Sequence, residues 1–193
     1  MKNIFIYIVS ATILYSCENK KFDLNKLNDA DLFHSAMQNL SDIIVYDIFS
    51  PPVASRVYLY PSIAAYELMA KHTPFKYKSL AGQVKELKEI PEPDRGFENF
   101  NLNLTILYAF NKVGKTLIFS DELMDNFEKR FTKKLNSIGV PRNIRIASEK
   151  YADKVAKHIL DWAKDDLYNQ TRTFPKYTIL EEKVYWKPTP PDY

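Results

Sequence analysis

The chain has 193 residues, of which 46% are hydrophobic and 14% aromatic, so it can bury the core of one domain. Only 4 residues are glycine, far below the usual ~7%, and β-sandwiches and Rossmann-type folds need more glycine at their turns. The net charge of +3 is small, and without a basic stripe it argues against nucleic acid as a partner. The composition therefore favours an all-α fold.

The first segment, MKNIFIYIVSATILYSC, has the form of an export signal. A positive start at Lys2 precedes an apolar run over residues 4–15, which is shorter than the ~20 residues that span a bilayer as a helix. The run ends in L-Y-S-C at residues 14–17, which resembles the lipobox of bacterial lipoproteins. Cys17 is the only cysteine, so an internal disulfide is impossible. We therefore expect a lipoprotein signal peptide over residues 1–16 and lipidation of Cys17.

A diacylglycerol on Cys17 would anchor the protein in a membrane without spanning it. The mature chain would begin at Cys17 and continue as a polar tether over residues 17–27. We expect an exported lipoprotein of the bacterial periplasm or cell surface, with the membrane as a partner through Cys17. The alternatives are an ordinary secretory signal and a buried N-terminal helix.

From residue 28 onward the apolar residues recur at helical spacing, which predicts a helical domain over residues 28–170 with about five to seven helices. Asn28 is the expected first cap. The apolar stripes are Leu32, Ala36, Leu40, Ile43, Ile44 and Ile48; Leu102, Ile106, Phe110 and Val113; Leu123, Phe127, Phe131, Leu135 and Ile138; and Ile144, Ala147, Tyr151, Val155, Ile159 and Trp162.

Prolines and caps place several helix boundaries. Ser50 and Pro51 start a new helix, because serine caps and proline suits the first turn. Pro61 lies inside that helix, where it removes a backbone donor and predicts a kink or break, with a second piece over 62–71.

Further boundaries follow along the chain. Residues 79–89 read as a loop with short helical character, closed by the breaker IPEPDRG. Ser120 begins the next-to-last helix, Gly139 ends it, and Pro141 opens a long final helix.

Arg56 is unusual because its neighbours in the sequence are mostly large and apolar. A guanidinium in such a setting needs a carboxylate partner. Asp42 and Asp47 on the preceding helix could reach it, so we predict a structural ion pair of Arg56 with Asp42 or Asp47, in preference to a catalytic arginine.

The tail over residues 171–193 has four prolines, several aromatic residues and no helical period. It reads as an irregular strap over the helices, or as a linker to a further domain.

Residues that could form a catalytic or metal site are scattered. His34, His72 and His158 lie on separate elements, and none has a second histidine or cysteine at metal-ligand spacing. The acidic pairs at 165–166 and 181–182 point apart in regular structure. No nucleophile elbow and no glycine-rich phosphate loop occurs.

Several stretches carry a family resemblance. LSDIIVYDIFSPPVASRVYLYPSIAAYE, YKSLAGQ, FNKVGKTLIFSDE, ILDWAKDDLYNQTR and YWKPTPPDY are similar to the N-terminal helical region of bacterial vanadium-dependent haloperoxidase-like proteins. These belong to the type 2 phosphatidic acid phosphatase (PAP2) superfamily. The resemblance implies halide oxidation by hydrogen peroxide with vanadate, or phosphoester hydrolysis, for the full-length family.

The family pocket that the resemblance implies uses three motifs, K-x6-R-P, P-S-G-H and S-R-x5-H-x3-D, to hold vanadate or phosphate. In this chain no arginine precedes a proline, and Pro61 and Ser62 are not followed by Gly-His. After Arg56, serine and tyrosine stand at 62 and 66, where the motif has histidine and aspartate. We therefore predict no catalytic, cofactor-binding or metal residue here, and no cofactor in this chain.

Two hypotheses about function follow. In the first, the chain is the N-terminal scaffold of a membrane-anchored haloperoxidase or acid phosphatase-like protein, inactive alone, whose partner is a catalytic domain further along or a second copy. In the alternative, it is a stand-alone, lipid-anchored helical interaction module. A carrier of a small ligand in the bundle would rest only on the aromatic residues of the helices.

Overall fold

The computed structural model describes residues 24–27, 30–175 and 178–187. The signal peptide, Cys17 and the cap at Asn28 lie outside the described residues and stay predictions. Of the expected tether only the end is described, where Leu24–Leu27 forms a short 3₁₀ helix, η1. Leu27 is buried in the core, so the chain joins the bundle before residue 28.

Six α-helices follow η1 in the part of the chain that the structure describes. They are α2 (Ala30–Tyr46), α3 (Pro51–His72), α4 (Leu102–Leu117), α5 (Asp121–Ile138), α6 (Arg142–Asp165) and α7 (Tyr168–Arg172). Within the same residues there is no strand, only an isolated bridge between Ala81 and Val84. The predicted all-α fold is confirmed.

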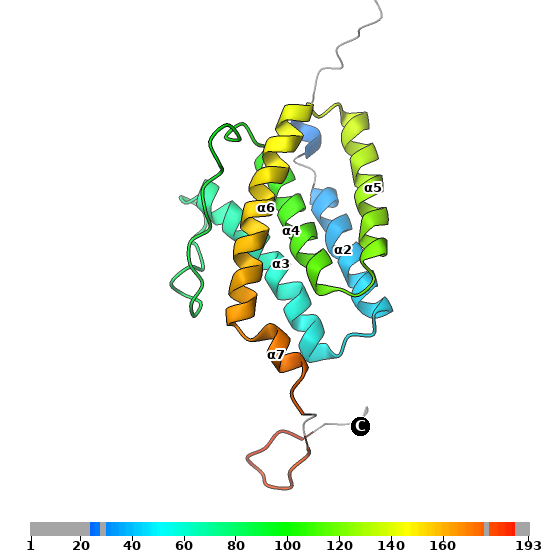
Figure 1. Ribbon diagram of the computed structural model, residues 1–193, viewed down its shortest axis with the longest axis vertical. Helices are drawn as coiled ribbons and strands as arrows, with labels where there is room; N and C mark the ends of the chain where they lie inside the picture. Colours follow the sequence, from blue (N-terminus) through cyan, green and yellow to red (C-terminus); the bar gives the residue numbers. More distant parts are fainter. Residues whose placement is uncertain (1–23, 28–29, 176–177, 188–193) are drawn as a thin grey trace, which may run out of the picture.

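The five long helices run alternately up and down in one bundle (Figure 1). Helix α4 lies at its centre and packs against α2, α3, α5 and α6. Buried residues occur around its whole circumference, as expected for a central helix. Gly114 faces α2, where a Cβ would lie 3.3 Å from Cδ1 of Leu40. Glycine therefore lets the two helices approach closely.

The helix ends follow local signals in the sequence. The side chain of Asn101 accepts a hydrogen bond from the Leu104 amide at 2.9 Å, which caps α4. Gly139 ends α5 with φ +81°, a conformation that costs a residue with a Cβ about 1 kcal/mol or more. The predicted start of α5 after Ser120 and its end at Gly139 are confirmed.

Three local predictions are wrong. Helix α3 continues through Pro61 as one element, so no second piece begins at residue 62. Ile48, expected on the first apolar stripe, lies beyond α2 with φ +54° and is 88% exposed. Residues 79–89 form turns and bends without a helix. Packing of α3 against α4 and α6 outweighs the loss of one backbone hydrogen bond at Pro61.

The predicted partners of Arg56 are also wrong. Arg56 pairs with the carboxylate of Asp166, just after α6. Asp47 instead accepts hydrogen bonds from the amide of Phe119 at 2.8 Å and from the amide and hydroxyl of Ser120. Asp42 accepts one from Gln38 within α2 at 2.8 Å. Arg56 therefore faces the end of α6. The order of the helices in the sequence had suggested a partner on α2 instead.

The described part of the tail leaves the lower end of the bundle after α7 (Figure 1). Residues 173–175 and 178–187 are all exposed, so they do not lie over the helices as a strap would. Among the described residues, no helix is both long and apolar enough to cross a bilayer.

Candidate functional site

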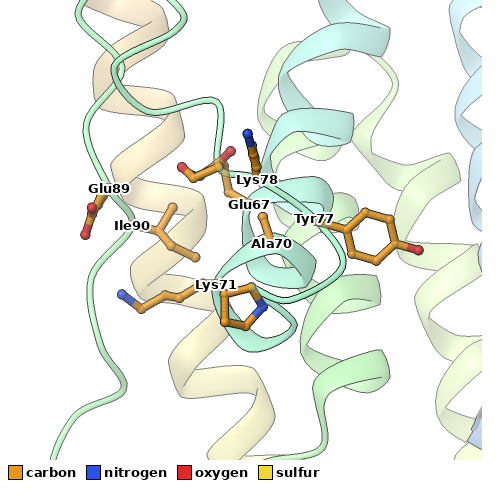
Figure 2. A pocket seen from close by; sticks show the side chains of 9 residues that line it. Glu67, Ala70, Lys71, Tyr77, Lys78, Glu89 and Ile90 are labelled. Carbon is orange, nitrogen blue, oxygen red and sulfur yellow. The ribbon is translucent and has the colours of Figure 1, made fainter.

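A first pocket, of about 350 Å³, lies between α3 and the long α3–α4 loop (Figure 2). Glu67 on α3 is 1% exposed, and its carboxylate accepts hydrogen bonds from the Ser79 hydroxyl at 2.6 Å and the Leu80 amide at 2.7 Å. Lys71, on the other side of the pocket, pairs with Glu92 of the loop at 2.8 Å. The loop thus supplies the partners of both Glu67 and Lys71, and these contacts hold the loop against α3.

A second pocket, of about 310 Å³, lies between α4, α5 and α6. We call it the α4–α6 pocket. Its lining consists of Tyr108, Asn111, Lys112, Glu128, Phe131, Thr132, Arg142, Arg145, Ile146 and Glu149. Lys112 of α4 and two arginines of α6, Arg142 and Arg145, therefore line a single cavity.

Two polar atoms of residues that line the α4–α6 pocket are enclosed by protein and have no hydrogen-bond partner among the described residues. One is Oδ1 of Asn111, whose residue is 2% exposed. The other is Nε of Arg145, whose Nη1 donates to Oδ1 of Asn136 at 2.7 Å. Most buried polar groups in proteins are paired, so these atoms distinguish this pocket from the first.

The charges at the α4–α6 pocket are nearly balanced. Lys112 donates to Asp153 at 2.7 Å and lies 3.5 Å from Glu149. Burial raises the pKa of Glu128, against the smaller opposing effect of Lys115. Burial, followed by the charge of Glu149, raises the pKa of Tyr108 to about 12. The pocket thus holds carboxylates as well as cations.

None of the three histidines lies in the α4–α6 pocket. His34 is on α2, and His158 on α6 is within 3.0 Å of the Lys88 carbonyl. His72 ends α3, where its Nε2 lies 3.0 Å from the Tyr151 hydroxyl and burial lowers its pKa. Among the described residues no group of three side chains could hold a metal ion.

Arg56 holds α7 against the lower end of the bundle. Its Nη1 donates to Thr171 at 2.8 Å, and its Nη2 donates to the Asp166 carbonyl at 2.9 Å and to the Asp166 carboxylate. The buried Tyr60 also donates to this carboxylate, at 2.7 Å. Arg172 of α7 lies over the Phe119 ring at 4.9 Å. This cluster fixes the place from which the tail leaves.

Large apolar side chains are exposed at the same end of the bundle. The lower apolar surface consists of Val45, Tyr46, Ile48 and Phe119, which are 62–88% exposed. Asp47, just after α2, accepts hydrogen bonds from the amides of Phe119 and Ser120 and so joins the end of α2 to the α4–α5 turn. A β-branched residue with positive φ, such as Ile48, is strained, so this surface combines strain with exposed apolar area.

Comparison with known proteins gives the class of the chain. No protein-family model and no curated protein matches it. A solved structure does match, and it shows that the chain is related to a vanadium-dependent haloperoxidase.

The matching protein is described as the first bacterial vanadium-dependent iodoperoxidase, with 38% sequence identity and a TM-score of 0.70. The match covers 84% of this chain but 39% of that one, and corresponds to its N-terminal part. The predicted haloperoxidase resemblance is confirmed at this level, while the PAP2 superfamily assignment stays a prediction.

Proposed function

We propose that this chain is the N-terminal helical scaffold of a membrane-anchored vanadium haloperoxidase-type or PAP2-type phosphatase-like protein, and that it performs no catalysis alone. The observation that carries the proposal is 38% identity over 84% of the chain, against coverage of 39% of the iodoperoxidase. The related protein therefore has a large further portion with no counterpart in these residues.

The side chains present support the absence of catalysis. The oxyanion-binding motifs of the family are missing from the sequence. The α4–α6 pocket, which is lined by a lysine and two arginines, is also lined by Glu128 and Glu149 and by no histidine. Carboxylates would repel a vanadate or phosphate dianion, and no histidine is present there to act as an acid, a base or a vanadium ligand.

The lower end of the bundle is the surface that we propose for contact with the catalytic portion. It exposes the lower apolar surface, and the tail leaves from the same end, fixed by Arg56 and Asp166. Contiguous exposed apolar side chains mark interaction sites in soluble proteins. The segment η1, drawn in blue, lies at the opposite end of the bundle (Figure 1).

The decisive experiment is an activity assay on the purified chain. We expect no iodide or bromide oxidation by hydrogen peroxide with added vanadate, no phosphatase activity, and no shift of the ⁵¹V NMR signal of vanadate on titration with protein. Vanadate-dependent halide oxidation above the buffer rate would contradict the proposal.

The alternative function, a stand-alone interaction module, has one observation in its favour. The buried residues from Leu27 to Tyr168 form one continuous core, as expected of a domain that folds by itself. A cooperative, soluble monomer in sedimentation would favour the module. Self-association that Ile48→Ser abolishes would favour a scaffold with an uncovered docking surface.

A further inference from the structure

We propose that the lower apolar surface binds the tail segment 178–187 of a second copy of this chain, so that two copies exchange tails. The same surface is proposed above for contact with the catalytic portion, and tail exchange occupies it in a chain that lacks this portion. Association and activity are measured separately, so either proposal can fail without the other.

The lower apolar surface has a cation beside its apolar side chains. Arg172, at the end of α7, is exposed, and its Cζ lies 4.9 Å from the centre of the Phe119 ring and 5.7 Å from that of Phe49. None of the ion pairs in the described part of the chain involves Arg172. A guanidinium that stacks on aromatic rings can still donate from its edge to a carboxylate. The surface is therefore suited to an apolar segment that carries a carboxylate.

The tail segment 178–187 has this composition. Its sequence, TILEEKVYWK, contains large apolar side chains that are 42–84% exposed. Glu181 pairs with Lys187 at 2.8 Å, whereas Glu182 is in none of the ion pairs of the described residues. Apolar and acidic side chains of the tail thus complement the apolar side chains and the cation of the surface. Glu182 is the expected partner of Arg172.

The tail segment is directed away from its own bundle. It forms a separate loop below the helices (Figure 1), in which the Tyr185 amide donates to the Glu182 carbonyl at 3.2 Å. Only residues 173–177 connect it to α7, a length of at most ~18 Å. Exchange of an identical segment between copies is a low-cost route to a dimer, and short connections favour it. A second copy is therefore the expected source of the bound tail.

A reciprocal exchange gives a closed dimer. Each copy supplies one surface and one tail, so two copies form two equivalent contacts. Ile48 on the surface is 88% exposed and Val184 on the tail is 84% exposed, and association removes both side chains from water. Ile48 also has φ +54°, a strained conformation for a β-branched residue. We therefore expect Ile48 and Val184 to be central to each contact.

Association can be measured by analytical ultracentrifugation on a chain that begins at residue 18, which contains the whole core and no lipid. We expect a monomer–dimer equilibrium with a Kd in the micromolar range. Arg172→Gln and Glu182→Gln should each raise this Kd by about threefold to tenfold, and the double variant should be no weaker than either. A chain that stays monomeric throughout the micromolar range, with its tail free or folded onto its own surface, would overturn the proposal.

A mixing experiment distinguishes tail exchange from other modes of association. Ile48→Asp damages the surface and Val184→Asp damages the tail, so each variant alone should be monomeric with a native circular dichroism spectrum. Their equimolar mixture should form a heterodimer, because one contact then has both sides unchanged. Phe75→Asp, at the other end of α3 and also 88% exposed, is the matched control and should dimerise as the unchanged chain does. Dimerisation of Val184→Asp alone, or no heterodimer in the mixture, would refute tail exchange.

Discussion

Replacement of Asp166 by alanine should loosen α7 and lower the stability of the whole domain. The carboxylate of Asp166 accepts hydrogen bonds from Arg56 and, at 2.7 Å, from Tyr60. Tyr60 is fully buried, so without Asp166 its hydroxyl would lose the partner that the structure gives it. Arg56 would keep its bonds to the Asp166 carbonyl and to Thr171.

The two interactions contribute unequally. A buried hydrogen bond to a charged group is worth about 1.5–3 kcal/mol. The ion pair with Arg56 adds about 1 kcal/mol or less, because the Asp166 side chain is 43% exposed and solvent screens the pair. We expect a loss of about 2–3 kcal/mol in the free energy of unfolding by urea. For a domain of this size that is a fall in Tm of roughly 4–12 °C.

Asp165 provides the matched control, because it is the exposed neighbour at the end of α6. Asp165→Ala should change the stability by no more than about 0.5 kcal/mol. A double-mutant cycle with Tyr60→Phe should give a coupling energy of about 1 kcal/mol or more, and proteolysis near α7 should become faster in Asp166→Ala. Equal stability of the Asp165 and Asp166 variants would refute this account of how α7 is held.

Three further predictions concern other parts of the chain. Cys17→Ser should move the protein from the membrane to the soluble fraction of a bacterial host and remove the acyl mass from its mass spectrum; membrane retention would contradict lipidation. Gly139→Ala should cost about 1 kcal/mol in urea unfolding, because alanine is strained at φ +81°, while Lys133→Ala should not. In the folded state burial raises the pKa of Glu128, against the smaller opposing effect of Lys115. The ionised form is therefore disfavoured in the folded protein, and the free energy of unfolding falls as the pH rises from about 4.5 toward the raised pKa. Glu128→Gln should therefore have the higher Tm at pH 7, and the difference should shrink below pH 4; a difference independent of pH would contradict this.

Features of the fold that depend on neighbours in the chain could be predicted from the sequence. The end of α5 follows from Gly139, whose left-handed conformation needs no distant partner. Ser120 marks the start of α5, but its hydroxyl donates to the distant Asp47 and does not cap the helix. The stripe from Leu123 to Ile138 predicts the buried face of the same helix. Pro61 is the counter-example, because contacts of α3 with α4 and α6 keep the helix continuous there.

Long-range partners could not be predicted in this way. Arg56 and Asp166 are 110 positions apart, and nothing in the sequence near either residue indicates the other. The α4–α6 pocket was missed for the same reason, since Asn111 and Arg145 come from different helices and match no motif spacing. Family motifs join residues close in sequence, whereas this pocket is lined by residues of three different helices.

The residues around the two pockets differ in how well their buried polar atoms are paired. In the first, the buried Glu67 is fully engaged by Ser79 and Leu80, as expected of a group kept to hold a loop. In the second, the buried Asn111 and Arg145 leave atoms unpaired, which costs free energy that an apolar residue at 111 would avoid. Asn111→Leu should therefore be at least as stable as the unchanged chain in urea unfolding. A marked loss of stability would mean that the asparagine is needed for the packing of the helices.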